Sequence, residues 1–205
     1  MASVDLNQYK AACFDGAVAL QLPVDANLAL VPVGPWILDE PDLVAKMAAW
    51  RGASMAMFFA QFESTPAKTL GYLRGASIGQ ANRLLFVIVE DGQIVGHVGF
   101  SNVSAETAEL DNVMRGIRSE NPLVMQLAIN ALVGWGFGTL GLSSVTLKVS
   151  SINSRAIALY ERCGFVVTSS VALRRVERDG ELVLTECSDA EADADQRSLT
   201  MTRVR

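Results

Sequence analysis

Asn153 and Tyr160 are the polar pair whose types and spacing point most clearly to chemistry. They lie seven residues apart, so on a helix both side chains point the same way and can serve one site. A phenol keeps its proton at neutral pH and can donate it to a developing negative charge. In the structural alternative, Tyr160 simply packs in an amphipathic helix with its hydroxyl hydrogen-bonded.

Three residues upstream are candidates for accepting a proton. Glu109 and Asp111 share one face of a predicted strand because side chains alternate along strands, and His97 is the chain's one histidine. Each could act directly or through a water molecule. The alternative is a half-exposed strand whose polar residues face solvent, with His97 structural or contacting a substrate.

The elements that must position these residues follow from periodicity and turn signals. Leu84–Val89 and Gln93–Phe100 flank Glu90-Asp91-Gly92, which predicts a hairpin. Thr65-Pro66 is typical of a helix start. Helices are expected at 39–50, 53–62, 65–73, 122–140, with Asn121 as the N-cap, and 153–162, and further strands at 28–33, on the sheet edge, 108–114, 144–149, 165–176, 181–185 and 198–204. The cluster Met55, Met57, Phe58, Phe59 and Phe62 is interpreted as core.

This element order predicts one α/β domain spanning 1–205, built on a mixed sheet. Residues 1–25 show no clear period, and the acidic segment Glu186–Gln196 is expected to be a solvated loop.

Composition narrows the function classes. A net charge of -5 without a basic stripe argues against a nucleic-acid partner. No apolar run is long enough to span a bilayer, so no membrane partner is expected. Cys13, Cys163 and Cys187 lack the spacing of a metal site, so we expect no metal and free thiols in a reducing compartment. With no secretory pattern at the N-terminus, this predicts a cytoplasmic protein.

The segment Leu142–Phe165 resembles the C-terminal motif of the GCN5-related N-acetyltransferases (GNAT). Its matching positions are Asn153, Ala156, Leu159, Tyr160, Glu161, Gly164 and Phe165. The resemblance implies a GNAT-like, mostly antiparallel twisted sheet flanked by helices, with acetyl-CoA or another acyl-CoA as co-substrate. It also implies that Tyr160 protonates the leaving thiolate and that Glu109 is the base.

The resemblance further implies that coenzyme A binds in the cleft where strand 108–114 parts from strand 144–149, with its pyrophosphate at the turn Gly116–Leu123. The coenzyme-binding residues expected are Asn112, Val113, Met114, Arg115, Gly116, Arg118, Asn121, Leu123 and Asn153. The turn departs from the family pattern, because Ser119-Glu120-Asn121-Pro122 stands where later glycines would be, and Pro122 has no N–H.

The N-terminal half resembles the branch that acylates amino-sugar nucleotides. Trp50, Arg51, His97 and Asp111 are the acceptor-binding residues expected, and Arg51, Arg74 and Arg83 could meet a pyrophosphate. The alternatives are a protein or peptide N-terminal amine as acceptor, or a non-catalytic acyl-CoA sensing module. The donor could be acetyl or larger, and a mean hydropathy of +0.28 makes a homodimer an expectation.

Overall fold

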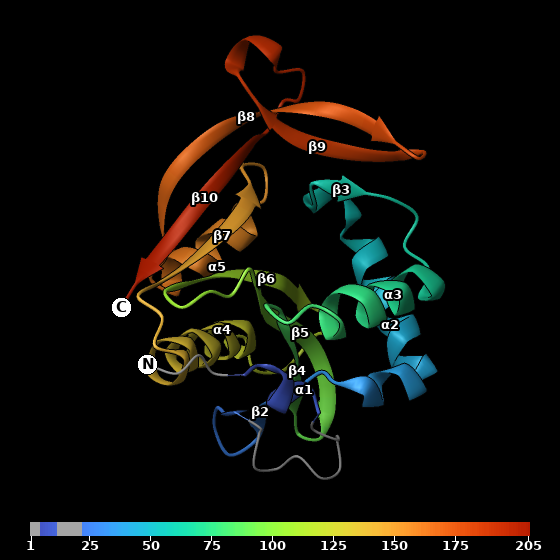
Figure 1. The fold of residues 1–205 in the computed structure, drawn as a ribbon, viewed down its shortest axis with the longest axis vertical. Coiled ribbons are helices and arrows are strands. Elements are labelled where there is room, and N and C mark those ends of the chain that lie inside the picture. Colours follow the sequence, from blue (N-terminus) through green and yellow to red (C-terminus); the bar gives the residue numbers. More distant parts are fainter. Residues whose placement is uncertain (1–4, 12–21) are drawn as a thin grey trace.

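The computed structural model describes residues 5–11 and 22–205, and Cys13 lies outside them (Figure 1). The described strands form one sheet in the order β1-β2-β4-β5-β6-β7-β10-β8-β9-β3, in which only β6 and β7 are parallel neighbours. In chain order the strands are β1 (Leu22–Pro23), β2 (Leu28–Pro32), β3 (Ala60–Gln61), β4 (Leu84–Glu90), β5 (Gln93–Ser101), β6 (Thr107–Arg115), β7 (Ser144–Ser150), β8 (Val166–Arg178), β9 (Glu181–Cys187) and β10 (Arg197–Val204).

Helices cover both faces of the sheet. They are α1 (Asn7–Lys10), α2 (Pro41–Ala53), α3 (Pro66–Tyr72), α4 (Val124–Trp135) and α5 (Ser154–Arg162), with 3-10 turns η2 (Pro35–Asp39), η3 (Met55–Met57) and η6 (Asp189–Glu191) and π-helical turns η4 (Leu73–Ile78) and η5 (Gly136–Leu140). The start of α3 confirms the predicted cap, because Thr65 accepts a hydrogen bond from the Lys68 N–H at 3.2 Å.

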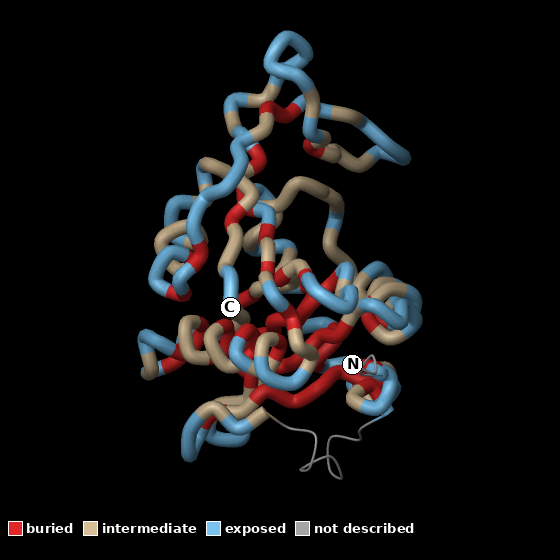
Figure 2. The backbone as a smooth tube through the Cα atoms, turned by 60° about the vertical axis from the view of Figure 1, so that its left-hand side comes forward, coloured by how far each residue is buried: buried red, intermediate tan, exposed pale blue. Residues whose placement is uncertain are grey.

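Strand β4 is buried on both faces, which explains its uninterrupted apolar sequence. Phe86 packs toward α4, where the Trp135 ring lies 5.8 Å away, while Leu85 and Val87 pack toward α2. Figure 2 shows this buried centre of the sheet, whereas the part formed by β8 and β9 has few buried residues. The predicted β4–β5 hairpin is confirmed, since Asp91 and Gly92 form a two-residue turn with positive φ at both positions.

Strands β6 and β7 pair briefly and then separate. Their parallel pairing covers Thr107 to Glu109 and goes no further. Just beyond it, Asn112 has a φ of 52°, and the β5–β6 register shifts so that Asp111 lies opposite Gly99 while Met114 lies opposite His97. This bulge corrects the simple alternation predicted for β6, because Met114 now shares a face with Asp111.

Three further sequence predictions need correction. Residues 53–62 do not form a helix: α2 ends at Ala53, a 3-10 turn follows, and the chain extends at Phe58 to pair β3 with β9. β2 is not the sheet edge, because β1 pairs outside it. Asn121 is not the N-cap of α4; its side chain accepts from the Leu123 N–H and closes a turn ahead of the helix.

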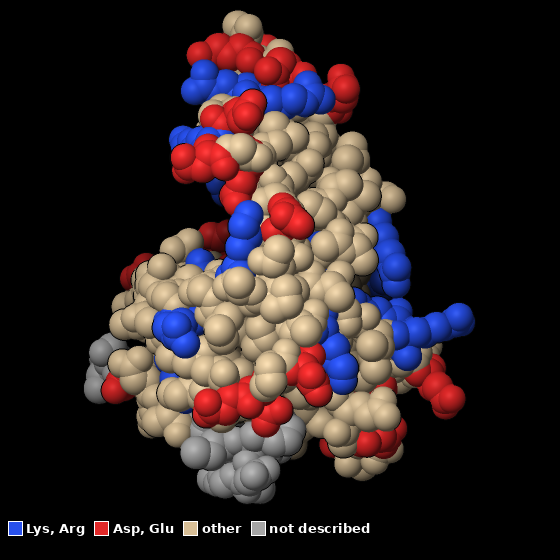
Figure 3. Space-filling model, turned by 90° about the vertical axis from the view of Figure 1, so that its right-hand side faces the viewer, with Lys and Arg blue, Asp and Glu red and all other residues tan. Residues whose placement is uncertain are grey.

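The β8–β9 hairpin extends away from the body as an arm, and β3 pairs along it (Figure 1). The acidic segment Glu186–Gln196 begins in the end of β9, passes through the short η6 turn and is mostly exposed. Figure 3 shows acidic and basic side chains side by side on this arm. Glu186 illustrates the pairing, with one carboxylate oxygen 2.8 Å from Lys148 Nζ.

The bulge generates a stability prediction at Asn112. Glycine adopts positive φ freely, whereas a β-branched residue is strained there. We expect Asn112→Gly to lose about 1 kcal/mol, mainly the hydrogen bond from Asn112 Nδ2 to Tyr72, and Asn112→Val to lose about 1–2 kcal/mol more. Urea unfolding of both variants measures this order. Equal stabilities for the two would show that the positive φ is not required.

Candidate active site

Two hollows meet at the bulge in β6. The first, the donor groove, has a volume of about 520 Å³ and lies where β6 parts from β7, with α5 along one side. The second, the acceptor pocket, has about 360 Å³ and lies between β5, β6, α2 and α3, with Glu181 of β9 at its rim. Phe58, Asp111, Asn112 and Met114 line both. Two ligands could therefore meet at this junction.

Tyr160 presents a protonated phenol to the donor groove. Its side chain is 8% exposed, and its ring packs edge-on against Phe165. Burial, followed by the negative charge of Asp111, raises the pKa of Tyr160. Within the described residues no side chain or backbone group hydrogen-bonds its hydroxyl. The hydroxyl is therefore available to a ligand.

Asn153 lines the same groove from the start of α5. Its side-chain oxygen accepts from the Ala156 N–H at 3.2 Å and so caps the helix. The helical spacing brings Asn153 and Tyr160 to one groove, with the amide NH₂ of Asn153 left for another partner.

Glu109 and Asp111 differ in how their carboxylates are engaged. Glu109 lines the donor groove, and Asn102 donates to one of its oxygens at 3.0 Å. Both oxygens of Asp111 are used: one lies 2.6 Å from Arg83 Nη1, and the other accepts from the Asn112 N–H at 2.7 Å. Glu109 therefore keeps an oxygen that no described residue engages.

A polar network fixes the wall of the acceptor pocket. Tyr72 accepts hydrogen bonds from Arg83 at 3.2 Å and from the Asn112 side chain at 2.8 Å. Burial raises the pKa of Tyr72, so it remains a phenol with a proton to donate. Tyr72 is a site residue that was not predicted, because its one sequence signal was a position near the end of a predicted helix.

His97 is buried in this wall and uncharged. Its Nδ1 lies 2.6 Å from the carbonyl oxygen of Asn112, which can only accept, so Nδ1 carries the proton and Nε2 is bare. Burial lowers the pKa of His97 to about 4. His97 lines the acceptor pocket as a neutral side chain.

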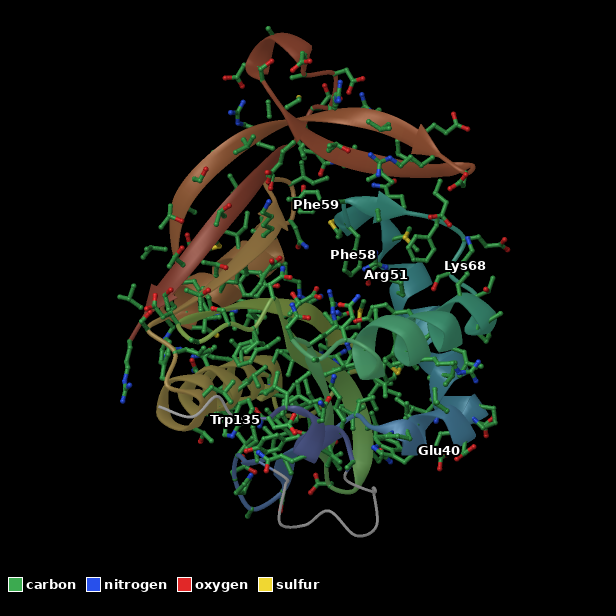
Figure 4. All side chains as sticks on the ribbon, viewed as in Figure 1. Glu40, Arg51, Phe58, Phe59, Lys68 and Trp135 are labelled. Atoms are coloured by element: carbon green, nitrogen blue, oxygen red, sulfur yellow. The ribbon has the colours of Figure 1, made fainter. Side chains whose placement is uncertain are left out.

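The aromatic cluster after α2 is a pocket wall instead of core. Phe58 and Phe62 line the acceptor pocket and are partly exposed, which corrects their interpretation as core residues. Their extended segment places Phe58 against the guanidinium of Arg51, whose central carbon lies 3.4 Å from the ring centroid. In Figure 4 the labelled side chains of Arg51 and Phe58 lie close together between α2 and β3.

Trp50 lies behind the acceptor pocket. Its ring packs flat on Gly116, where an added Cβ would come within 2.3 Å of it, and its centroid is 6.3 Å from the His97 ring. It lines a different hollow, together with Trp36. The structure thus brings Arg51, His97 and Asp111 to the pocket and leaves Trp50 outside the lining.

The expected coenzyme-binding residues divide in two. Asn112, Val113, Met114, Arg115 and Asn153 line the donor groove, whereas Gly116, Arg118, Asn121 and Leu123 do not. Arg118 and Asn121 line a hollow beside the acidic residues of the β4–β5 turn. The guanidinium of Arg115 donates to the carbonyls of Ile117 and Ser119, so it holds the turn together.

A family model described as the acetyltransferase (GNAT) domain matches residues 34–166. The chain belongs to this acetyltransferase family. It is accordingly an N-acyltransferase with an acyl-CoA co-substrate. A search of the curated proteins finds no match.

Solved structures share the fold at low identity. A spermidine N-acetyltransferase from Vibrio cholerae with CoA and spermine has 18% identity and a TM-score of 0.64, covering 88% of this chain and 96% of its own. A microcin self-immunity acetyltransferase (MccE) with acetyl-CoA and AMP has 16% identity and a TM-score of 0.64, and the match covers 89% of this chain and 94% of that one. A ribosomal L7/L12 α-N-protein acetyltransferase (RimL) with coenzyme A has 12% identity and a TM-score of 0.64, and the match covers 90% of this chain and 97% of that one.

The donor groove fits an acyl-CoA chemically. Because β6 pairs with β7 only as far as Glu109, the β7-facing backbone of Leu110 to Arg115 is free to pair with the amides of an extended chain. Within the described residues no helix is long and apolar enough to cross a membrane, and no His, Cys, Asp and Glu side chains gather into a metal-binding group.

Buried, neutral His97 generates a pH prediction. Its folded pKa is lowered from 6.5 to about 4, so its contribution to stability is complete above pH 6.5 and lost as the pH falls toward 4. The loss is about 3 kcal/mol. We expect His97→Gln, which keeps a donor for the Asn112 carbonyl, to lose less stability than the wild type between pH 6.5 and 4.5. Urea unfolding across this range gives the comparison, and parallel curves would contradict a buried neutral histidine.

Proposed function

We propose that the protein transfers an acetyl or larger acyl group from acyl-CoA, held in the donor groove, to the amine of a small acceptor in the acceptor pocket. The observation that carries this proposal is the junction of the two hollows at Asp111 and Asn112. An amine entering from one side can reach a thioester lying on the other. Direct attack then needs a group that accepts the amine proton and one that protonates the thiolate.

Tyr160 is the proposed general acid. Its hydroxyl is protonated, lines the donor groove and has no described hydrogen-bond partner, so it can donate to the departing sulfur. Donation there stabilises negative charge as it develops, which lowers the barrier of the chemical step.

Glu109 is the proposed base. It lines the donor groove and has one oxygen free, whereas Asp111 is held by Arg83 and its own neighbour's N–H. His97 offers a bare Nε2, but it is buried in the wall of the acceptor pocket and does not line the donor groove. Glu109 acts directly on the amine or through a water molecule.

For the acceptor, a nucleotide-linked amino sugar is our specific proposal. Three cationic side chains, Arg51, Lys68 and Arg83, line the pocket with the rings of Phe58 and Phe62. Cations and aromatic faces suit a nucleotide with its pyrophosphate. A polyamine suits the pocket less well, because its positive charges would face these three cations. The two acids of the lining, Asp111 and Glu181, are each already paired with a cation and so do not compensate.

Turnover with purified protein tests the proposal. Acetyl-CoA is combined with nucleotide-linked amino sugars, peptides with free N-termini and polyamines, and thiol release is measured. Release with an amino-sugar nucleotide supports the proposal, and release with peptides alone would redirect it to a protein N-terminal amine. Tight acyl-CoA binding without release across the whole panel would indicate a sensing module instead.

Tyr160→Phe tests the general acid. The substitution keeps the ring and its packing on Phe165 and removes only the proton donor. We expect the chemical step to slow by roughly ten- to a thousandfold, with acyl-CoA affinity and thermal midpoint nearly unchanged because no described hydrogen bond is lost. The matched control is Tyr9→Phe, which should keep the wild-type rate. Tyr9 lies on α1, and its ring packs against Trp135 of α4. A normal rate for Tyr160→Phe removes it from the mechanism.

Glu109→Gln tests the base. We expect acyl transfer to slow most at low pH, where more of the amine carries the proton that the base must take, while acyl-CoA affinity stays nearly intact. Exposed Glu106→Gln, in the β5–β6 turn, is the control. If Glu109→Gln matches the wild type across pH, Glu109 is a strand-surface carboxylate and the proton leaves through water or His97.

A further inference from the structure

Charge in the acceptor pocket is unevenly compensated. Arg83 is paired with Asp111 at 2.6 Å, and Lys68 is paired with Glu181 at 2.7 Å. Arg51 is the third cation, and it has no carboxylate partner within the described part of the chain. The pocket therefore holds one cation more than its paired acids neutralise.

Arg51 is also poorly supplied with hydrogen-bond acceptors. Its Nη2 donates to the carbonyl of Ala60 at 3.1 Å, while Nε and Nη1 donate to no described residue, and Nε is shielded from solvent. Burial lowers the pKa of Arg51 to about 10, so it remains cationic at neutral pH. A partly buried guanidinium with unused donors costs free energy that a bound anion would offset.

The setting of Arg51 holds it in place for a ligand. Its guanidinium is stacked on Phe58 at 3.4 Å, with Phe62 at 5.5 Å, so the plane of the fork is fixed before anything binds. Both rings line the acceptor pocket together with Arg51, and Figure 4 shows Arg51 and Phe58 close to each other. A preorganised guanidinium suits a planar carboxylate or a phosphate group.

The acid that remains available to an amine lies in the donor groove, because Glu109 has an oxygen that no described residue engages. Asp111 lies at the junction of pocket and groove, and Glu109 lies in the groove beyond it. An acceptor with an amine at one end and an anion at the other would match this arrangement, with the amine toward the groove and the anion toward α2.

We propose that the acceptor carries an anionic group, a carboxylate or a phosphate, and that Arg51 binds this group and sets the specificity of the pocket. This inference rests on the proposed function, since it names the class of amine that the site acylates. Arg51 contacts the acceptor away from the reacting nitrogen, so it acts on acceptor affinity and orientation and leaves the proton transfers to other residues.

Matched acceptor pairs test the proposal. Glycine, β-alanine and 4-aminobutanoate are each compared with the corresponding primary amide, and phosphoethanolamine is compared with ethanolamine, with acetyl-CoA as donor. We expect the anionic members to have the higher kcat/KM, and the carboxylate and phosphate arms show which group the pocket prefers. Equal kcat/KM within every pair would overturn the proposal.

Arg51→Gln removes the charge but keeps a side-chain donor for the Ala60 carbonyl. We expect it to lose roughly ten- to a hundredfold in kcat/KM for the anionic members and little for the neutral ones. Arg51→Lys keeps the charge and should retain part of the preference. The matched control is Arg178→Gln, because Arg178 is exposed at the end of β8 and lines neither the acceptor pocket nor the donor groove. A loss shared equally by anionic and neutral acceptors would mean that Arg51 has a structural role.

Binding measured without turnover separates this inference from the proposed function. With the protein saturated by coenzyme A, 4-aminobutanoate and phosphoethanolamine should raise the thermal midpoint, their neutral counterparts should not, and the effect should vanish in Arg51→Gln. If anions bind through Arg51 but no amine is acylated, the proposed function fails and the anion site stands. If amines are acylated but anions bind equally well to the variant, only the anion site fails.

Discussion

The positive φ of Asn112 is the local constraint from which the site is built. A residue in this conformation cannot continue a regular strand, so β6 bulges and its register with β5 shifts between His97 and Gly99. The parallel pairing with β7 ends three residues earlier, at Glu109. The donor groove lies in the resulting gap. Asparagine suits the position because its short polar side chain tolerates the left-handed region better than most residues do.

The same bulge organises the acceptor pocket. It brings the backbone carbonyl of Asn112 to His97 and the side-chain amide of Asn112 to the Tyr72 hydroxyl. It also leaves Asp111 in the lining of both hollows. A buried polar wall of this kind is stabilised when its members hydrogen-bond one another, and Arg83 links Tyr72 to Asp111 in this way, although its Nε has no partner among the described residues. One consequence is that Asp111 serves as a counter-charge, whereas Glu109 keeps an oxygen free.

The arm, at the β9–β3 end of the sheet, contributes Glu181 to the acceptor pocket. β3 pairs with β9, and Lys68 reaches Glu181 near the hairpin turn, so a segment between α2 and α3 is tied to strands more than 100 residues later in the chain. This tie holds Phe58 and Phe62 extended, with Arg51 stacked against them. The cation that we assign to an acceptor anion thus owes its position to a long-range strand pairing.

Local sequence determined those parts of the protein that depend on near neighbours. Helical period placed Asn153 and Tyr160 on one side of the helix, and Asp91-Gly92 set the β4–β5 hairpin. The family match confirmed the fold and the acyl-CoA co-substrate that the segment ending at Phe165 implied. Each of these signals lies within a few residues or in one motif.

Three features were decided only by the tertiary structure: which side chains of β6 share a face, the conformation of residues 53–62, and which charged side chains of the pocket are paired. The alternation of β6 changes at Asn112 because of its register against β5, and β3 forms because β9 is there to pair with it. Asp111 has a cationic partner, whereas Arg51 has no carboxylate partner among residues 5–11 and 22–205, and this difference depends on which side chains meet across the pocket. A period read along one strand or helix does not contain these contacts, because they join residues far apart in the chain.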